Sequence, residues 1–197
     1  MIKVAITGNI ASGKSEVQKI LVDLGYKFLD TDDVAHKLLS KYSTEILNLF
    51  SNIDISDNSG NISREKLGKI VFTNNKHKEK LESFIHPKIR SEILKFFTDN
   101  INKDFVFVGI PLLFEANMQD LFDKKVLIYA NDTIRLDRLI KRNSYNLEYA
   151  QKRLNSQNSQ DLKKNLCDYI IENNSDKTLL NEKVIDFLND IKRSVSR

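Results

Sequence analysis

The sequence is poor in cysteine, proline and glycine, and it contains no tryptophan. Its one cysteine, Cys167, cannot form a disulfide within the chain, which is typical of a reducing compartment. Two prolines, six glycines and a hydrophobic fraction of 41% exclude collagen-like repeats and low-complexity sequence. No apolar run approaches the length of a membrane span, and a strand-like run begins at the N-terminus. We therefore expect a cytoplasmic protein with no signal peptide and no membrane partner.

The charge is moderately positive, with a formal net charge of +4 over 197 residues and an isoelectric point near 9.0. This balance suits anionic ligands, either nucleotides or nucleic acid. The lysines are scattered, however, and no basic stripe carries interleaved aromatic residues. We favour a solvated surface over a nucleic-acid groove and expect no nucleic-acid partner.

The strongest motif lies near the N-terminus, between an apolar run and an amphipathic helical pattern. It has the form Gly-x-x-x-x-Gly-Lys-Ser and consists of Gly8, Asn9, Ile10, Ala11, Ser12, Gly13, Lys14 and Ser15. Backbone N–H groups of such a loop, together with the positive end of the helix, form a cage for phosphate oxygens. Lys14 would reach the β- and γ-phosphates of ATP, and the Ser15 hydroxyl would ligate Mg²⁺. The alternative is a glycine-rich turn with a surface lysine.

Short apolar runs alternate with helical periodicities along the rest of the chain. They predict strands near residues 4–7, 26–29, 105–110, 125–130 and 169–171. Such alternation predicts an α/β protein of the P-loop NTPase type, with three layers and a five-stranded parallel sheet flanked by helices. We assign residues 1–39, 104–142 and 166–197 to a nucleotide-binding core. Residues 40–103 form a helical acceptor-binding insertion, and residues 143–165 form a helical lid.

Acidic residues follow two of the expected strands, at the edge of an open α/β sheet where ligands bind. Asp30 and Asp32 follow the second strand, where a carboxylate could deprotonate an acceptor hydroxyl or reach a metal ion. The alternative is that Asp32 or Thr31 caps the next helix. Glu115 follows the third strand, and it is either a surface charge or part of the same site.

Three arginines follow the fourth expected strand, and a polar helical stretch comes after them. Arg135, Arg138 and Arg142 are spaced to lie near one helix face, which is either an exposed basic face or, as we favour for Arg138, a group that neutralises transferring phosphates. The stretch from Leu147 to Leu166 looks too polar for the core, which favours a mobile lid.

Two positions in the insertion have open alternatives. Arg64 opens a helix, where a cation is unfavourable for the dipole, so it is either solvated or faces an anion. His86 directly precedes Pro87. A histidine at such a position is most often a packed, hydrogen-bonded residue where a helix begins, and less often a catalytic residue.

Several signatures along nearly the whole chain resemble those of dephospho-CoA kinases, in the order seen in that family. They are the phosphate loop, Asp30-Thr31-Asp32, Ser63 to Leu67 with Val71-Phe72, Ile85-His86-Pro87, Ile110 to Glu115, Arg138 with Arg142, Arg153 with Gln157, and Asp168 to Asn173. The resemblance implies that ATP phosphorylates the ribose 3′-hydroxyl of dephospho-CoA to give CoA and ADP, the last step of coenzyme A synthesis. It implies ATP and dephospho-CoA as small-molecule substrates, with Mg²⁺ as cofactor.

The resemblance also implies roles for single residues. Asp32 would be the base, with Lys14 and Arg138 as the other catalytic groups. Ser15 and Asp30 would serve the metal. The remaining nucleotide contacts would come from the phosphate loop, Arg142 and, near the adenine, Asn173. The residues implied to bind the acceptor are Asp32, Arg64, His86, Pro111, Leu112, Glu115, Arg153 and Gln157.

The sequence departs from the family pattern at four positions. Asn9 and Ala11 stand where the family usually has glycine, so we expect an adjusted loop geometry. Gly109 stands where many members have an aspartate, which leaves Mg²⁺ without a ligand from the third strand. Ser175 replaces a glycine, which weakens the assignment of Asn173 to adenine.

Two other functions remain open at this point. The first is another P-loop kinase acting on a small molecule or a nucleoside monophosphate. The second is a non-catalytic nucleotide-binding protein. A monomer or weak homo-oligomer is expected in each case.

Overall fold

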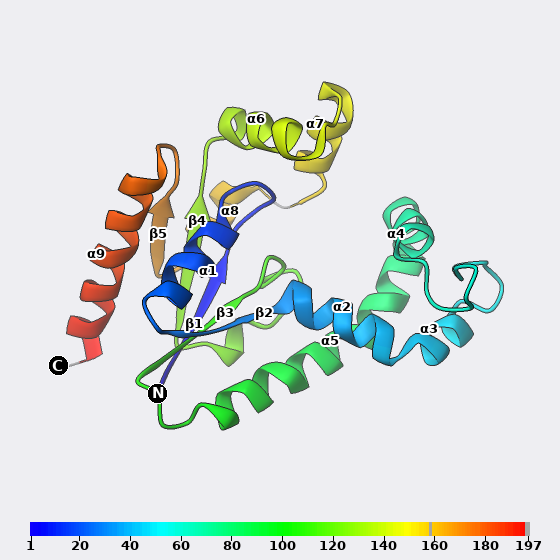
Figure 1. Ribbon diagram of the computed structural model, residues 1–197, viewed down its shortest axis with the longest axis horizontal. Helices are drawn as coiled ribbons and strands as arrows, with labels where there is room; N and C mark the ends of the chain where they lie inside the picture. The colour runs from blue at the N-terminus through cyan, green and yellow to red at the C-terminus, as the bar shows by residue number, and fades with distance from the viewer. Residues whose placement is uncertain (158, 196–197) are drawn as a thin grey trace. The chain divides into compact units, whose positions relative to one another are not determined.

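The computed structural model describes residues 1–157 and 159–195 and divides the chain into two compact units (Figure 1). The sheet unit comprises Met1–Leu29 and Asn100–Arg197, and the helical unit comprises Asp30–Asp99. The helical unit therefore begins about one helix earlier than the insertion expected at residues 40–103. The functional division into core, insertion and lid stays a prediction.

The sheet has five strands, which are β1 (Ile2–Thr7), β2 (Lys27–Asp30), β3 (Phe105–Gly109), β4 (Lys124–Tyr129) and β5 (Tyr169–Glu172). Their order is β2-β3-β1-β4-β5, and β1 pairs in parallel with both β3 and β4. All five residues of β3 are buried, as expected for a parallel strand covered on both faces. The predicted five-stranded parallel sheet is confirmed.

Two helices of the sheet unit pack into one hydrophobic cluster with the strands. They are α1 (Lys14–Asp23), which directly follows the phosphate loop, and α9 (Lys177–Val195). Val17 and Leu21 of α1 lie in this cluster beside Val4 and Ile6 of β1. The predicted apolar face of the last helix is buried as expected: Leu180, Val184, Phe187, Leu188 and Ile191. Each such fully buried side chain contributes about 1.5–3 kcal/mol, so β1 and α1 hold the two ends of the phosphate loop firmly.

The remaining elements of the sheet unit are the short helix η1 (Gln119–Leu121) and three helices, α6 (Asp132–Asn143), α7 (Leu147–Asn155) and α8 (Gln160–Lys164). The stretch predicted to be too polar for the core thus breaks into α7 and α8. That prediction is wrong for α8, because Gln160 and Lys163 are only 4% and 1% exposed. Their polar ends are bonded to other elements, which allows their burial.

The helical unit contains α2 (Thr31–Lys41), α3 (Ser43–Leu49), α4 (Arg64–Thr73) and α5 (Asn75–Asp99). Its core is the cluster of Ile46, Phe50, Ile55 and Leu67. Pro87 lies inside α5, so the prediction that a helix begins at His86 is wrong. None of the described helices in either unit is long and apolar enough to cross a membrane.

Candidate active site

The phosphate loop joins β1 to α1, and side chains distant in sequence hold its carbonyl groups. Arg135 Nε donates to the carbonyl of Ile10 at 3.0 Å. The Ser12 carbonyl accepts from Asn173 Nδ2 at 2.8 Å and from Arg138 Nη1 at 3.5 Å. These bonds fix the shape of the loop within the protein alone, as a preorganised anion site requires.

The backbone conformation and the close neighbours of the loop restrict which residues fit at three of its positions. A Cβ atom at Gly8 would lie 2.5 Å from Ser12 Oγ and 2.8 Å from the carbonyl oxygen of Ile128. Gly13 has a φ of 101°, and a Cβ atom there would lie 2.0 Å from Asn173 Nδ2. Ala11 also has a positive φ, 61°, which costs a residue with a Cβ about 1–2 kcal/mol. The loop therefore holds a residue with a Cβ in the left-handed conformation at Ala11.

Replacing Gly13 with alanine is expected to weaken ATP binding at least about tenfold, because the new Cβ must displace Asn173 from the loop carbonyl that it holds. Titration calorimetry with ATP measures this loss. Gly25→Ala is the matched control, since Gly25 has a φ of 85° but nothing within 4 Å of an added Cβ. Equal ATP affinity in the two variants would contradict the prediction, because the clash with Asn173 would then have no effect on ATP binding beyond that of backbone strain.

Arg138 and Asn173 lie together on the loop. Asn173 is 5% exposed, and its Oδ1 accepts from Arg138 Nη2 at 3.3 Å. The helical spacing favoured a role for Arg138 at the phosphates, and the resemblance implied that Asn173 lies near the adenine. The structure brings both side chains to the Ser12 carbonyl, so each supports the loop whatever else it contacts.

The space beside Gly109, at the end of β3, is already occupied. A Cβ atom at Gly109 would lie 2.9 Å from the Phe28 ring and 3.3 Å from Lys14 Nζ. No carboxylate fits at this position unless Phe28 moves. Among residues 1–157 and 159–195, no three histidine, cysteine or acidic side chains gather as a metal site. The Ser15 hydroxyl is an oxygen ligand of the kind that Mg²⁺ takes beside substrate phosphates.

Glu115, in the segment after β3, is not a surface charge. Both of its carboxylate oxygens are buried, and Lys163 Nζ of α8 lies 2.9 Å from Oε1 without hydrogen-bonding alignment. The same ammonium donates to the carbonyl of Pro111 at 3.3 Å, and that carbonyl also accepts from Thr7 Oγ1. Lys163 is a residue that the sequence reasoning missed, because a lysine on a short polar helix is usually solvated.

The predicted lid residues differ in where they lie. Gln157 Oε1 accepts from the backbone N–H of Ile10 at 2.7 Å, so Gln157 contacts the phosphate loop. Arg142 is exposed and donates to Asn143, the next residue, and the structure does not bring it to the loop. Arg153 is partly buried on α7. Leu112 lies between Pro111 and Leu113, in the turn that follows β3.

In the helical unit, Asp30 caps α2. Its Oδ1 accepts from the backbone N–H of Asp32 at 2.9 Å. The prediction that Asp32 or Thr31 is the cap is therefore wrong, and the structural role belongs to Asp30. The Asp32 side chain is exposed in the first turn of α2, where the helix dipole stabilises its charge.

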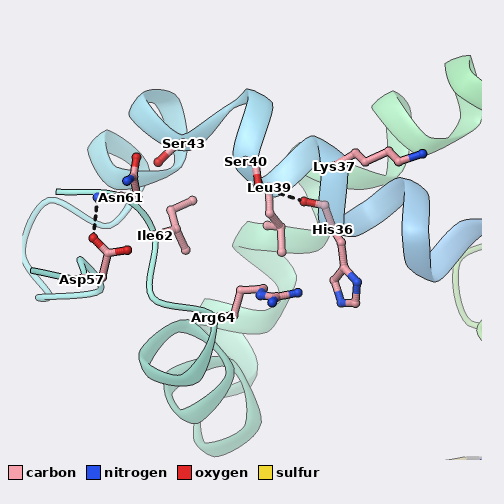
Figure 2. A pocket seen from close by; sticks show the side chains of 9 residues that line it. All are labelled: His36, Lys37, Leu39, Ser40, Ser43, Asp57, Asn61, Ile62 and Arg64. Atoms are coloured by element: carbon pink, nitrogen blue, oxygen red, sulfur yellow. Dashed lines mark hydrogen bonds between the residues drawn. The ribbon is translucent and has the colours of Figure 1, made fainter. Parts of the chain in front are cut away.

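The helical unit also contains a cavity of about 720 Å³ (Figure 2). Its lining combines basic, acidic, uncharged polar and apolar side chains: His36, Lys37, Leu39, Ser40, Ser43, Asp57, Asn61, Ile62 and Arg64. Arg64 and His36 extend toward one another within it (Figure 2). Lys37 and Arg64 thus bring two positive charges to the cavity against the one negative charge of Asp57, which favours an anionic ligand over plain solvation of Arg64.

His86 is not among the residues that line this cavity. Burial lowers the pKa of His86 below its ordinary value, although the charge of nearby Glu82 acts in the opposite direction. A lowered pKa favours the neutral imidazole at neutral pH. His86 is therefore better suited to donating or accepting a hydrogen bond than to holding an anion.

Comparisons with known proteins agree with this arrangement. A family model described as dephospho-CoA kinase matches residues 2–178. The dephospho-CoA kinase of Oceanobacillus iheyensis is 38% identical over 176 residues, which cover 87% of this chain and 88% of that protein. The solved dephospho-CoA kinase of Campylobacter jejuni has 34% identity, a TM-score of 0.72 and coverage of 98% of both chains. A solved protein of Thermus thermophilus has a TM-score of 0.87, with 27% identity and coverage of 96% of both chains.

Proposed function

The chain belongs to the dephospho-CoA kinase family, and from this premise we propose which of its residues carry out the transfer. The protein is an ATP-dependent kinase that transfers the γ-phosphoryl group of ATP to dephospho-CoA, giving CoA and ADP. ATP and dephospho-CoA are its substrates.

The phosphate loop binds the phosphates of ATP in this proposal. Its support is the set of bonds from Arg135, Arg138 and Asn173 that hold the loop carbonyls. Phosphoryl transfer depends mainly on alignment and on positive charge around the phosphoryl oxygens. Lys14 supplies that charge to the β- and γ-phosphates. Ser15 and Asp30 would hold Mg²⁺, and the ion would supply positive charge to the phosphates.

The acceptor is bound in part by the cavity of the helical unit. Dephospho-CoA carries a diphosphate, and we assign Arg64 to it, one of the two exposed cations at that cavity with Lys37. Asp32 orients the ribose 3′-hydroxyl and takes its proton. Further contacts to the acceptor come from His86, Pro111, Leu112, Glu115, Arg153 and Gln157.

One assay tests the acceptor and its site together. ADP release from ATP and Mg²⁺ is measured with dephospho-CoA, adenosine, AMP or no acceptor. Arg64→Gln is expected to raise the KM for dephospho-CoA about tenfold, roughly the loss of one charge-assisted bond of 1.5–3 kcal/mol, and to leave the KM for ATP unchanged. Lys69→Gln, an exposed lysine on the same helix, is the control.

An unchanged KM for dephospho-CoA in Arg64→Gln would move the acceptor away from the cavity. A preference for AMP or another acceptor would instead replace dephospho-CoA in the proposal. The proposal also includes a cytoplasmic location, since the reaction consumes ATP, and a monomer or weak homo-oligomer as the active form. The sheet unit binds the nucleotide, and residues 40–103 bind the acceptor. Of residues 143–165, α7 acts as the lid, because Gln160 and Lys163 of α8 are buried and bonded to other elements.

A further inference from the structure

Arg135 is an unusual residue among the arginines of α6. It is only 3% exposed, whereas arginine is almost never fully buried unless it is paired. Its ion-pair partner Asp132 has a side chain that is 80% exposed, so the burial of the guanidinium does not serve to cover that carboxylate. Removing the charge from water is energetically costly, so the role of the burial is to be sought in the other contacts of Arg135.

The contacts of Arg135 lead to a single residue of the phosphate loop. Its Nε donates to the carbonyl of Ile10 at 3.0 Å. The N–H of Ile10 donates to Gln157 Oε1 at 2.7 Å. Both backbone polar groups of Ile10 are therefore held by side chains that lie more than a hundred residues away in sequence. Ile10 directly precedes Ala11, whose positive φ of 61° needs support from its surroundings.

The same guanidinium connects the loop to α8. Asp132 Oδ1 accepts from Arg135 Nη1 at 2.7 Å and from Gln160 Nε2 at 3.1 Å. Gln160 Nε2 also donates to the carbonyl of Ala130, at the end of β4, at 2.9 Å. The loop, the first turn of α6 and α8 thus share one hydrogen-bond network, in which Arg135 is the member that reaches the loop carbonyl.

We propose that Arg135 is a positioning residue for ATP, which acts by fixing the Ile10 carbonyl and, through it, the N–H groups of the phosphate loop. This inference rests on the proposed role of the loop as the ATP site. Arg135 does not contact the nucleotide in this proposal. Its planar guanidinium bonds Ile10 and Asp132 at the same time, whereas a lysine is a point charge on a flexible stem.

A purely stabilising role fits the structure less well. Arg135 Nη2 is buried and has no hydrogen-bond partner among the described residues. Burial also lowers the pKa of Arg135, against the opposing effect of Asp132. An apolar residue of similar length avoids both costs, and it leaves no buried charge unpaired, because the Asp132 side chain is 80% exposed. Loss of ATP affinity without loss of stability therefore distinguishes positioning from support of the fold.

The test uses Arg135→Met and Arg135→Lys in the full chain, with Lys141→Met as the matched control. Lys141 lies on the same helix, and its ion pair with Asp137 is exposed on both sides. Three quantities are measured: the Kd for ATP by calorimetry, the KM for dephospho-CoA, and the Tm without ligands. We expect Arg135→Met to raise the Kd for ATP about tenfold, Arg135→Lys to raise it less, and both to change the KM for dephospho-CoA less than about twofold.

The Tm of Arg135→Met is expected to stay within about 4 °C of the unmodified protein, a shift that corresponds to one small interaction in a chain of this size. A large fall in Tm with an unchanged Kd for ATP would overturn the proposal, as would an equal loss of affinity in Lys141→Met. If Arg135→Met does not fold, Arg135→Lys decides, because unchanged ATP affinity in that folded variant would also overturn it. Lys14→Met tests the premise separately: if it retains full ATP affinity, the loop is not the ATP site.

Discussion

Replacing Asp32 with asparagine is expected to lower kcat by about 10²- to 10⁴-fold, the usual contribution of a positioned general base. Asparagine keeps the shape of the side chain but cannot accept the proton of the ribose hydroxyl. The Tm should hardly change, because the Asp32 side chain is exposed and the N-cap of α2 is Asp30. ADP release with saturating dephospho-CoA, followed beside thermal unfolding, measures both effects.

Asp33→Asn is the matched control for this experiment. Asp33 is also exposed in the first turn of α2, so its replacement removes the same charge from the same helix terminus. An equal loss of kcat in Asp33→Asn would show that the charge at the helix terminus matters rather than a base at position 32. Substantial activity in Asp32→Asn would assign proton transfer to another group.

The phosphate loop and the sheet could be predicted because their signals are local. The Gly-x-x-x-x-Gly-Lys-Ser spacing is visible in the sequence, and two reasons for it are local: Gly8 faces Ser12 within the loop, and Gly13 has a positive φ. Ile128 and Asn173, which also exclude a Cβ at these glycines, are distant in sequence. The strands are short buried runs, whose apolar residues mark them without knowledge of their partners. Tertiary contacts then reinforce what the local sequence already favours.

The polar residues that support the site could not be predicted in the same way. Arg135, Gln160 and Lys163 stand in helices whose composition indicates a solvated surface, yet all three are buried. Their partners lie far along the chain: Arg135 contacts Ile10, and Lys163 contacts Glu115. Periodicity shows which face of a helix is apolar, but it does not show that a distant carbonyl or carboxylate will satisfy a buried charge.

The surroundings of Gly109 could be predicted only in part. The sequence showed that this position lacks a carboxylate, but it could not show what occupies the space. The structure places the Phe28 ring and Lys14 Nζ there, from segments that are distant in sequence. Phe28 therefore makes the absence of a side chain at Gly109 a requirement of packing, and a metal ligand could be introduced there only together with a smaller residue at position 28.

Lys163→Met is expected to destabilise the protein by about 3–5 kcal/mol, the usual cost of leaving the other member of a buried ion pair without its partner. Both oxygens of Glu115 are buried, so its carboxylate would lose the only ammonium within ion-pair distance among the described residues. Urea unfolding measures the change in free energy. Lys152→Met is the matched control, since Lys152 is an exposed lysine on the neighbouring helix α7, and its loss should leave the stability nearly unchanged.

The double variant Lys163→Met with Glu115→Gln separates stability from function. Removing both charges should restore most of the lost stability, because no buried charge is then left unpaired. If Glu115 contacts the acceptor, the restored protein will still show a raised KM for dephospho-CoA, with the KM for ATP unchanged. Recovery of stability and of the KM together would mean that the pair serves only to hold α8 against the segment after β3. Failure of the double variant to regain stability would mean instead that the bond from Lys163 to the Pro111 carbonyl is the contact that matters.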